Sequence, residues 1–341
     1  MSQAAPDSAL ARTDDRDTDR PLVTVAILAF NQRDFIQDCI ASAFAQTYEP
    51  TEVLITDDCS SDDTVAKIEE SLAIYGGRGS VTLRQNETNL GWEKWGRLIN
   101  EVVASARGQL VVLMAGDDIS RPDRVKKLVT AWIEAGRPTC VLHSAFETMS
   151  NAQDLDGAIR REGRDFGDRT PHEMVRRDGE GMLGATVAFT PDLFTKFGPL
   201  PEAAAFEDRT LGFRAILAGQ VIYLPDPLVR YRLHSANLSG PNIYSDPARW
   251  SRFCRGHQTL YASFRADYLT IYPDGGADAR VLPEIERRQA QLRSREKLLT
   301  GTFLQKALAA WSVTNGQRNW LYRTLFVLRA VGFRKPQGAK Q

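Results

Sequence analysis

The sequence predicts an α/β fold in which a mostly parallel, mixed sheet of the Rossmann-like kind is flanked by helices. Three observations lead to this prediction. Apolar runs such as residues 22–30 and 110–115 are typical of strands buried on both faces. From residue 22 to about residue 146, these runs alternate with segments whose apolar residues recur every three or four positions, as in amphipathic helices. Two of the runs end at paired carboxylates, at the edge where such sheets bind their ligands.

The elements of this first part follow one another in regular alternation. Capping residues at 60–63, Gly76, Gly108 and Pro122 mark helix ends. Strands are expected at residues 22–30, 51–58, 80–85, 110–115 and 138–146, and helices at residues 31–46, 60–76, 91–108 and 121–136.

The alternation weakens beyond residue 150. Residues 151–169 are polar and contain glycines, which predicts a loop. The remaining patterns predict a short strand and a short helix within 179–201, a helix at 206–220, two short strands and a polar loop within 221–239, and a mainly helical segment from 245 to 335.

Composition divides the chain and excludes several classes of function. Residues 1–20 offer little to bury and are expected to be a disordered leader, followed by an α/β domain at 21–240 and a helical C-terminal extension at 241–341. The 43 basic and 43 acidic residues leave no basic excess for nucleic acid. Four scattered cysteines without a CxxC pair favour a reducing, cytoplasmic compartment. No apolar run reaches the roughly 18 residues of a membrane span.

The adjacent acids Asp117 and Asp118 follow a buried strand directly. Neighbouring carboxylates repel each other unless a positive group joins them, and Mg²⁺ or Mn²⁺ prefers such oxygen ligands. A solvated turn whose acids cap the helix at 122–135 explains the pair equally well.

The order of the motifs adds a resemblance. The stretch 23–64 runs from a strand through an aromatic-Asn turn and a helix ending in Gln-Thr to "DDCS". It is followed by "NLGWEKWGRLINEVVASARGQLVVLMAGDD" and, later, by "FEDRTLGFRAILAGQVIYLPDPLVRYRLHSANLS". Across residues 22 to 239 this layout resembles the inverting family 2 glycosyltransferases, which have the nucleotide-diphospho-sugar transferase (GT-A) fold. The resemblance implies a nucleotide-sugar donor, Mn²⁺ or Mg²⁺, a glycan or lipid-linked acceptor and a role in cell-surface glycan or polysaccharide synthesis.

For the donor nucleotide, the resemblance implies three contacts. The Phe30 ring can stack on a pyrimidine, with Asn31 beside it. Asp58 can accept a hydrogen bond from N3–H of uracil or thymine, which favours a UDP- or dTDP-sugar because cytosine lacks that hydrogen. The alternative readings are core packing for Phe30 and a turn for Asp57 and Asp58.

For the metal and the diphosphate, the resemblance places Asp118 as the direct ligand and Asp117 near the ribose or sugar. The family's usual Asp-x-Asp-Asp is shortened here, because Ala115 occupies the first position. Arg230, Arg232 and His234 alternate and so share one face of a strand, where two guanidiniums suit a diphosphate. The resemblance adds that His234 completes the metal shell; the alternative is a polar loop residue.

For catalysis, the resemblance makes Asp208 the general base and places Glu207 and Gly184 on the sugar and acceptor side. Both acids open a helix, where free N–H groups stabilise negative charge, and ordinary helix-start acids are common. Trp92 and Trp95 could stack on a sugar, but their spacing favours a core face of a helix.

The last segment, residues 319–335, reads as a basic amphipathic helix, and no acid follows Glu296. Such a helix can lie on an anionic membrane surface, which would suit a peripheral enzyme at the cytoplasmic face; alternatively it packs on the α/β domain. The sequence also bears on two other functions. A nucleotidyltransferase needs a glycine- and basic-rich phosphate loop, which "AFNQRD" does not provide. A catalytically silent nucleotide-sugar-binding homologue is compatible with the shortened "AGDD".

Overall fold

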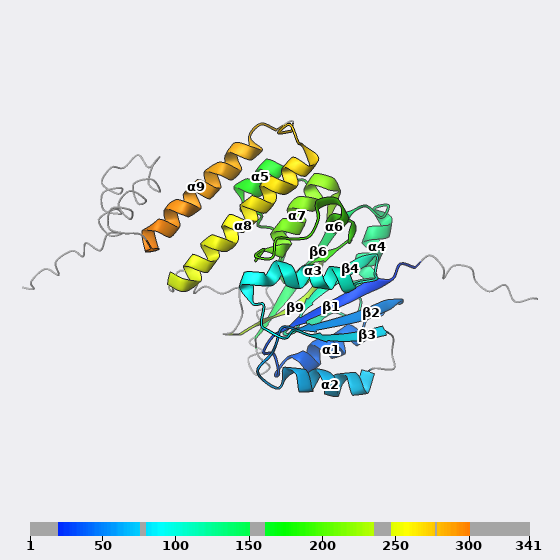
Figure 1. Ribbon diagram of the computed structural model, residues 1–341. Helices are drawn as coiled ribbons and strands as arrows, with labels where there is room; N and C mark the ends of the chain where they lie inside the picture. Colours follow the sequence, from blue (N-terminus) through cyan, green and yellow to red (C-terminus); the bar gives the residue numbers. More distant parts are fainter. Residues whose placement is uncertain (1–19, 76–79, 151–160, 235–246, 277, 301–341) are drawn as a thin grey trace, which may run out of the picture.

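The computed structural model describes residues 20–75, 80–150, 161–234, 247–276 and 278–300 (Figure 1). The predicted leader, apart from its last residue, and the predicted amphipathic helix at 319–335 lie outside the described residues. None of the described helices is both long and apolar enough to cross a membrane.

The described strands form one sheet in the order β3-β2-β1-β4-β8-β6-β9-β5, with β7 paired to β6. The pairs β3-β2, β2-β1, β1-β4 and β6-β9 are parallel and the others antiparallel, which confirms the predicted mostly parallel, mixed sheet. The strands are β1 (Val23–Ala29), β2 (Thr51–Asp57), β3 (Ser80–Gln85), β4 (Leu110–Ala115), β5 (Ile119–Ser120), β6 (Cys140–Ser150), β7 (Arg161–Glu162), β8 (Ala188–Phe189) and β9 (Gln220–Leu233).

Helices cover both faces of the sheet (Figure 1). Alternate residues of β1 face opposite ways: Val25 and Ile27 pack with α1 and α4, whereas Ala26 and Leu28 pack with α3 and α7. The helices are α1 (Ile36–Phe44), α2 (Thr64–Tyr75), α3 (Trp95–Ser105), α4 (Arg124–Glu134), α5 (Pro171–Arg176), α6 (Asp192–Phe197), α7 (Glu207–Ala218), α8 (Pro247–Ile271) and α9 (Val281–Thr300), with 3₁₀ turns η1 (Trp92–Lys94) and η2 (Gly184–Thr186).

The prediction of two short strands within 221–239 was wrong, because β9 is a single strand of 14 residues. The strand contains Pro225 and Pro227, which cannot donate hydrogen bonds to a ladder. The pairing of β9 with β6 instead contains register shifts near Ala145, where Pro227 is its partner, and the irregularity accommodates the prolines.

The C-terminal helices α8 and α9 lie side by side next to α5 and α7 (Figure 1). Leu260, Phe264 and Ile285 from these helices belong to the same apolar cluster as Phe213 of α7. A buried ion pair also joins α7 to α8, with 3.0 Å between Arg214 Nε and Asp267 Oδ2. The helical character predicted after residue 245 is therefore observed up to residue 300, while the domain boundary at 240/241 stays a prediction.

The carboxyl ends of β1, β2 and β4 meet at one edge. The N–H of Asp58 donates to the carbonyl of Ala29 (2.8 Å), and the N–H of Gly116 donates to that of Leu28 (2.9 Å). These bonds place the segments after all three strands next to one another, as the parallel topology requires.

Candidate active site

At this edge, the turn after β1 is fastened to the turn after β2. The N–H of Asn31 donates to Ser60 Oγ (2.9 Å), and Asn31 Oδ1 accepts from the N–H of Ser61 (2.8 Å). Asn31 has a φ of 50°, a left-handed conformation that asparagine tolerates well. The neighbouring Phe30 side chain is 44% exposed, so its ring is free of the core. The reading of Phe30 as a core residue is therefore wrong.

Asp58 is almost completely buried and accepts four hydrogen bonds. Its Oδ1 accepts from Asn86 Nδ2 (2.8 Å) and the N–H of Leu90 (2.9 Å), and its Oδ2 from Asn89 Nδ2 (3.0 Å) and the N–H of Gly91 (2.9 Å). These donors come from the loop that leads into η1 and α3. Asp58 therefore holds this loop, and a base contact through N3–H, which stays a prediction, would have to share an oxygen with one of these donors.

The next residue, Cys59, has a φ of 61°. That left-handed conformation is unfavourable for a cysteine, and strained residues of this kind cluster at functional sites. Gly91, which donates to Asp58, has a φ of 54°, where a glycine carries no side-chain penalty.

After β4, the structure brings Asp117, Asp118, Arg232 and His234 together. His234 Nε2 lies 2.8 Å from Asp117 Oδ2, and the N–H of Arg232 donates to Asp118 Oδ1 (2.8 Å). Arg232 Nε donates to the Asp117 carbonyl (2.9 Å), and its guanidinium lies 4.7 Å from the centre of the Phe35 ring. Arg232 thus braces the acidic turn, whereas the other predicted diphosphate ligand, Arg230, is exposed.

One carboxylate oxygen of this group has no partner. Asp118 is 2% exposed, and its buried Oδ2 accepts no hydrogen bond within the described structure. Burial, together with the adjacent Asp117 charge, raises the pKa of Asp118 to about 8. A buried oxygen of this kind is suited to a cation, because a cation would restore its charged form.

Few side chains at this turn are placed to bind a metal ion. In the described part of the chain, no three His, Cys, Asp or Glu side chains are grouped closely enough to hold a metal ion. Asp118 Oδ2 is nevertheless available, with Asp117 and His234 beside it. Mg²⁺ is commonly held by one or two carboxylates together with substrate phosphates and water, so this donor set fits a metal that arrives with a diphosphate.

Arg124, on α4, is a site residue that the sequence reasoning missed. Its guanidinium is 1% exposed, and Nη2 donates to the carbonyls of Leu113 and Ala185, both at 3.0 Å. Its charge faces Asp118, and burial lowers the pKa of Arg124 to about 10. The sequence did contain one signal for it: Arg124 lies on the same face of α4 as the apolar residues Val125, Leu128 and Trp132.

The second pair of acids begins α7. Glu207 is buried, and its Oε2 accepts from Trp95 Nε1 (2.8 Å); Asp208 Oδ1 accepts from the N–H of Arg209 (2.7 Å). A Cβ added to Gly184 would lie 2.7 Å from Glu207 Oε1, so the absent side chain leaves room for that carboxyl. The structure therefore brings the predicted pair Glu207 and Gly184 together.

Burial dominates the protonation of these acids. It raises the pKa of Glu207 together with repulsion from Asp208, and the hydrogen bond from Trp95 opposes the rise. Burial also raises the pKa of Asp208, while the positive charge of Arg209 lowers it. Two neighbouring acids at a helix start thus both have raised pKa values, and perturbed pKa values of this kind cluster at functional sites.

Two links join the separate parts of this site. The 86–91 loop held by Asp58 leads to Trp95, which reaches Glu207; Arg124 joins β4 to the η2 turn that contains Gly184. The sequence placed Trp95 in a core face, and it is partly buried there as well as bonded to Glu207. No contact within the described residues joins Asp58, Asp118 and Asp208 directly.

Comparison with known proteins decides the family. The model of glycosyl transferase family 2 matches residues 24–172. An uncharacterised glycosyltransferase of Haemophilus influenzae is 31% identical over 250 residues, which span 71% of this chain and 74% of the relative. The chain belongs to glycosyltransferase family 2.

Other relatives of this family 2 glycosyltransferase extend the comparison. The succinoglycan biosynthesis protein ExoO of Rhizobium meliloti is 35% identical over 121 residues, 36% of this chain and 32% of ExoO. The UDP complex of S. aureus TarS 1–349 has a TM-score of 0.55 at 17% identity, covering 91% of this chain and 88% of TarS 1–349. The mannosyltransferase PcManGT of Pyrobaculum calidifontis, solved with GDP-Man and Mn²⁺, has a TM-score of 0.53 at 17% identity, covering 92% of this chain and 86% of PcManGT. These structures confirm the predicted GT-A fold.

Proposed function

We propose that this glycosyltransferase moves a sugar from a UDP-sugar, or a dTDP-sugar, to an acceptor hydroxyl with inversion, in polysaccharide or cell-surface glycan synthesis. The observation that carries the proposal is the pairing of two acidic centres. One centre is Asp117 and Asp118 at the carboxyl end of β4, and the other is Glu207 and Asp208 at the start of α7. The two centres are connected through α4 and η2.

The donor base lies at the edge of β1 and β2. The exposed Phe30 ring stacks on the pyrimidine, Asn31 fixes the turn beneath it, and Asp58 accepts N3–H while it holds the 86–91 loop. Uridine is favoured over thymidine because the TarS neighbour binds UDP. Asp58→Asn should weaken UDP binding and loosen the loop, since an amide can accept at one end only.

Asp118 Oδ2 would hold a divalent ion, Mn²⁺ or Mg²⁺, with Asp117 on the ribose or sugar side and His234 as a further ligand. When bound, the ion neutralises negative charge on the departing diphosphate. The Mn²⁺ in the PcManGT neighbour supports this assignment. His234 reaches an ion through Nε2 only by giving up its contact with Asp117. Arg230, exposed on β9, grips the phosphate oxygens, and Arg232 contributes while bracing the turn.

Asp208 acts as the general base. The acceptor oxygen attacks the anomeric carbon and its proton passes to Asp208; the bond from that carbon to the phosphate oxygen breaks, and the electron pair leaves with UDP. A single displacement of this kind inverts the configuration and needs no covalent enzyme intermediate. Glu207 lies beside Gly184 and accepts a hydrogen bond from Trp95 Nε1, which fixes the start of α7 on the acceptor side.

The test measures release of UDP from UDP-sugars with Mn²⁺, for the intact protein and for Asp208→Asn. We expect the variant to lose at least about a hundredfold in rate, in the range for a lost general base, while it binds UDP normally. Ala115 in place of the family's first acid keeps the alternative of a silent homologue open. A protein that binds UDP but releases none from any donor, with or without the substitution, would establish that alternative.

The acceptor is a glycan or a lipid-linked glycan. A peripheral contact with the cytoplasmic face of the membrane would suit the lipid-linked form. It is motivated by the basic amphipathic pattern of residues 319–335, which lie outside the described residues. Deleting residues 316–341 should then abolish sedimentation with vesicles that contain anionic lipid, and unchanged sedimentation would remove this part of the proposal.

A further inference from the structure

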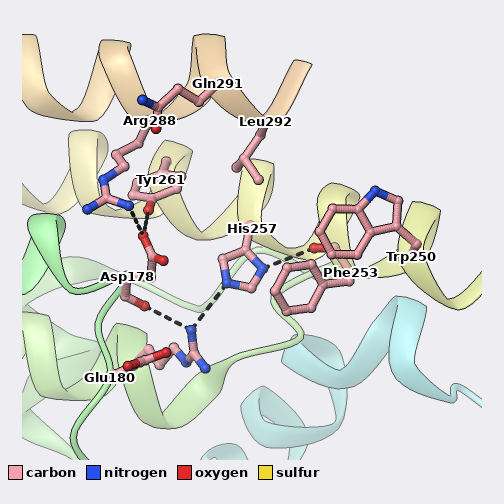
Figure 2. Close-up of a pocket in the computed structure, with 10 residues that line it drawn as sticks. Asp178, Glu180, Trp250, Phe253, His257, Tyr261, Arg288, Gln291 and Leu292 are labelled. Carbon is pink, nitrogen blue, oxygen red and sulfur yellow. Dashed lines mark hydrogen bonds and ion pairs between the residues drawn. The ribbon is translucent and has the colours of Figure 1, made fainter. Parts of the chain in front are cut away.

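A cavity of about 500 Å³ opens between α7, α8, α9 and the turn at residues 178–180 (Figure 2). Its volume is within the usual range of small-molecule sites. Every side chain that lines it comes from residue 178 or later, whereas the family match ends at residue 172. The cavity therefore lies outside the residues that the family model matches, and most of its lining comes from α8 and α9, where acceptor preference would be encoded.

One wall of the cavity is aromatic. Trp250 and Phe253 on α8 are stacked, with ring centres 5.3 Å apart and planes 17° apart. Phe253 lies 4.0 Å from the His257 ring, which in turn lies 4.4 Å from Phe206. Trp250 and Phe253 are only partly buried, so they offer ring surface to the cavity. Flat aromatic surface with few polar groups is typical of sites for amphipathic ligands such as sugar rings.

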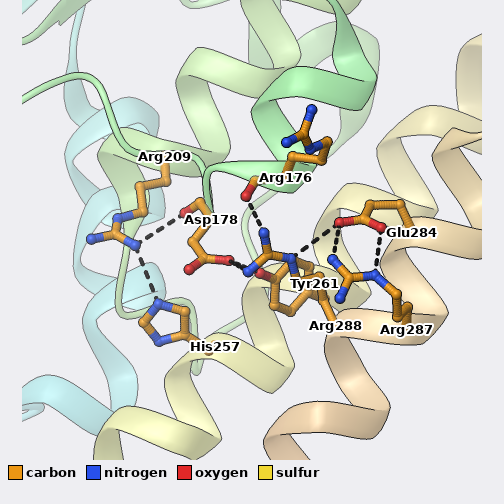
Figure 3. A network of polar contacts seen from close by, with 8 residues as sticks. All are labelled: Arg176, Asp178, Arg209, His257, Tyr261, Glu284, Arg287 and Arg288. Atoms are coloured by element: carbon orange, nitrogen blue, oxygen red, sulfur yellow. Dashed lines mark hydrogen bonds and ion pairs between the residues drawn. The ribbon is translucent and has the colours of Figure 1, made fainter. Parts of the chain in front are cut away.

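The opposite wall is polar and fixed by hydrogen bonds (Figure 3). Arg209 Nη1 donates to the carbonyl of Asp178 (3.0 Å) and lies 3.2 Å from His257 Nε2. His257 Nδ1 lies 3.0 Å from the carbonyl of Phe253, which can only accept, so Nδ1 carries the hydrogen. Nε2 of neutral His257 is then the acceptor for Arg209. The Asp178 carboxylate accepts from Tyr261 and pairs with Arg288 Nη1 at 3.0 Å.

The charges of this lining balance. Arg209 and Arg288 are matched by Asp178 and by Glu180, which is exposed at the rim. A site for phosphate or another anion would present arginines in excess, as in phosphate recognition elsewhere. The balanced lining instead favours a neutral ligand with many hydroxyl groups.

Two residues at the cavity lie beside the proposed base along the chain. Arg209 follows Asp208 directly, and Phe206, two residues before Asp208, contacts the cavity residue His257. We propose that the cavity is an acceptor subsite, in which a neutral sugar ring of the acceptor glycan stacks on Trp250 and presents the neighbouring sugar's hydroxyl to Asp208. This assignment rests on the proposed function and names the substrate class for its acceptor side.

The test uses the full chain and three neutral trisaccharides as probes: maltotriose, cellotriose and chitotriose. Saturation-transfer NMR measures their binding to the intact protein, to Trp250→Ala, to Trp250→Phe and to Arg252→Ala, an exposed residue of α8 outside the cavity lining. We expect at least one probe to bind. Trp250→Ala should weaken it about tenfold or more, whereas Trp250→Phe and Arg252→Ala should retain most of the affinity.

A parallel titration with UDP and Mn²⁺ separates this proposal from the function itself. Trp250→Ala should bind UDP as the intact protein does, because Trp250 lies outside the nucleotide edge. Failure of all three trisaccharides to bind, or equal binding to Trp250→Ala, overturns the acceptor subsite even if UDP binds. If the intact protein does not bind UDP, the proposed function is refuted, and the trisaccharide results still decide whether the cavity binds sugar.

Discussion

The buried ion pair between Arg214 and Asp267 provides a quantitative test of how firmly α8 is joined to α7. The two side chains are 2% and 4% exposed, and Nε lies 3.0 Å from Oδ2. Arg214 Nη1 also donates to the carbonyl of Gly198 (2.8 Å). Asp267→Ala would leave the guanidinium buried without its counter-charge, which typically costs about 3–5 kcal/mol. An unfolding entropy of about 2.1 cal/mol/K per residue gives about 1.4 °C per kcal/mol for 341 residues, so the melting temperature should fall by roughly 4–7 °C.

Urea denaturation followed by circular dichroism measures this loss. Lys67→Ala removes one partner of an exposed pair on α2 and should leave the unfolding midpoint within error. The double substitution Arg214→Met with Asp267→Leu removes both charges and should recover most of the stability, because neither charge is left unpaired. Equal, small effects of Asp267→Ala and Lys67→Ala would refute the reasoning that α8 is part of the catalytic core.

Three further predictions concern the site. Trp95→Phe removes the hydrogen-bond donor to Glu207 and should lower the free energy of unfolding by about 1–3 kcal/mol. Trp92→Phe should lower it less, because Trp92 Nε1 has no hydrogen-bond partner within the described residues. Equal losses for the two variants would contradict this reasoning. Asp118 binds its proton more tightly in the folded protein than in the unfolded chain, so its contribution to stability is lost as pH rises from about 4 to about 8. Mn²⁺ competes with that proton and should bind more tightly as pH rises through this window. Calorimetry that finds constant Mn²⁺ affinity between pH 6 and 8 would contradict this prediction. Gly184→Ala places a Cβ 2.7 Å from Glu207 Oε1 and should lower the transfer rate while UDP affinity stays unchanged, so a normal rate would argue against a close approach there.

Much of the fold followed from periodicity. The strand predicted at 80–85 has the observed bounds, and the one predicted at 22–30 differs from β1 by one residue at each end, because an apolar run between turn signals has few alternatives. The prediction of two strands in place of β9 failed because β9 continues through Pro225 and Pro227. The pairing partner, β6, accommodates them through register shifts that only the assembled sheet reveals.

The site was harder to predict than the fold. Adjacent acids in the sequence indicated Asp117 and Asp118, but not that Arg124 would be buried facing them or that Arg232 would brace their turn, because both depend on contacts between distant segments. The cavity beside Arg209 had no sequence signal. Its aromatic wall is spaced along α8, while its charged side chains come from three other segments.

Titration calorimetry of UDP tests most directly whether the acidic turn after β4 grips a diphosphate through a cation. The intact protein should bind UDP about tenfold or more tightly with Mn²⁺ than with EDTA, and Asp118→Asn should abolish that difference without abolishing folding. Identical UDP affinity with and without the ion, or an undiminished gain in Asp118→Asn, would contradict the account.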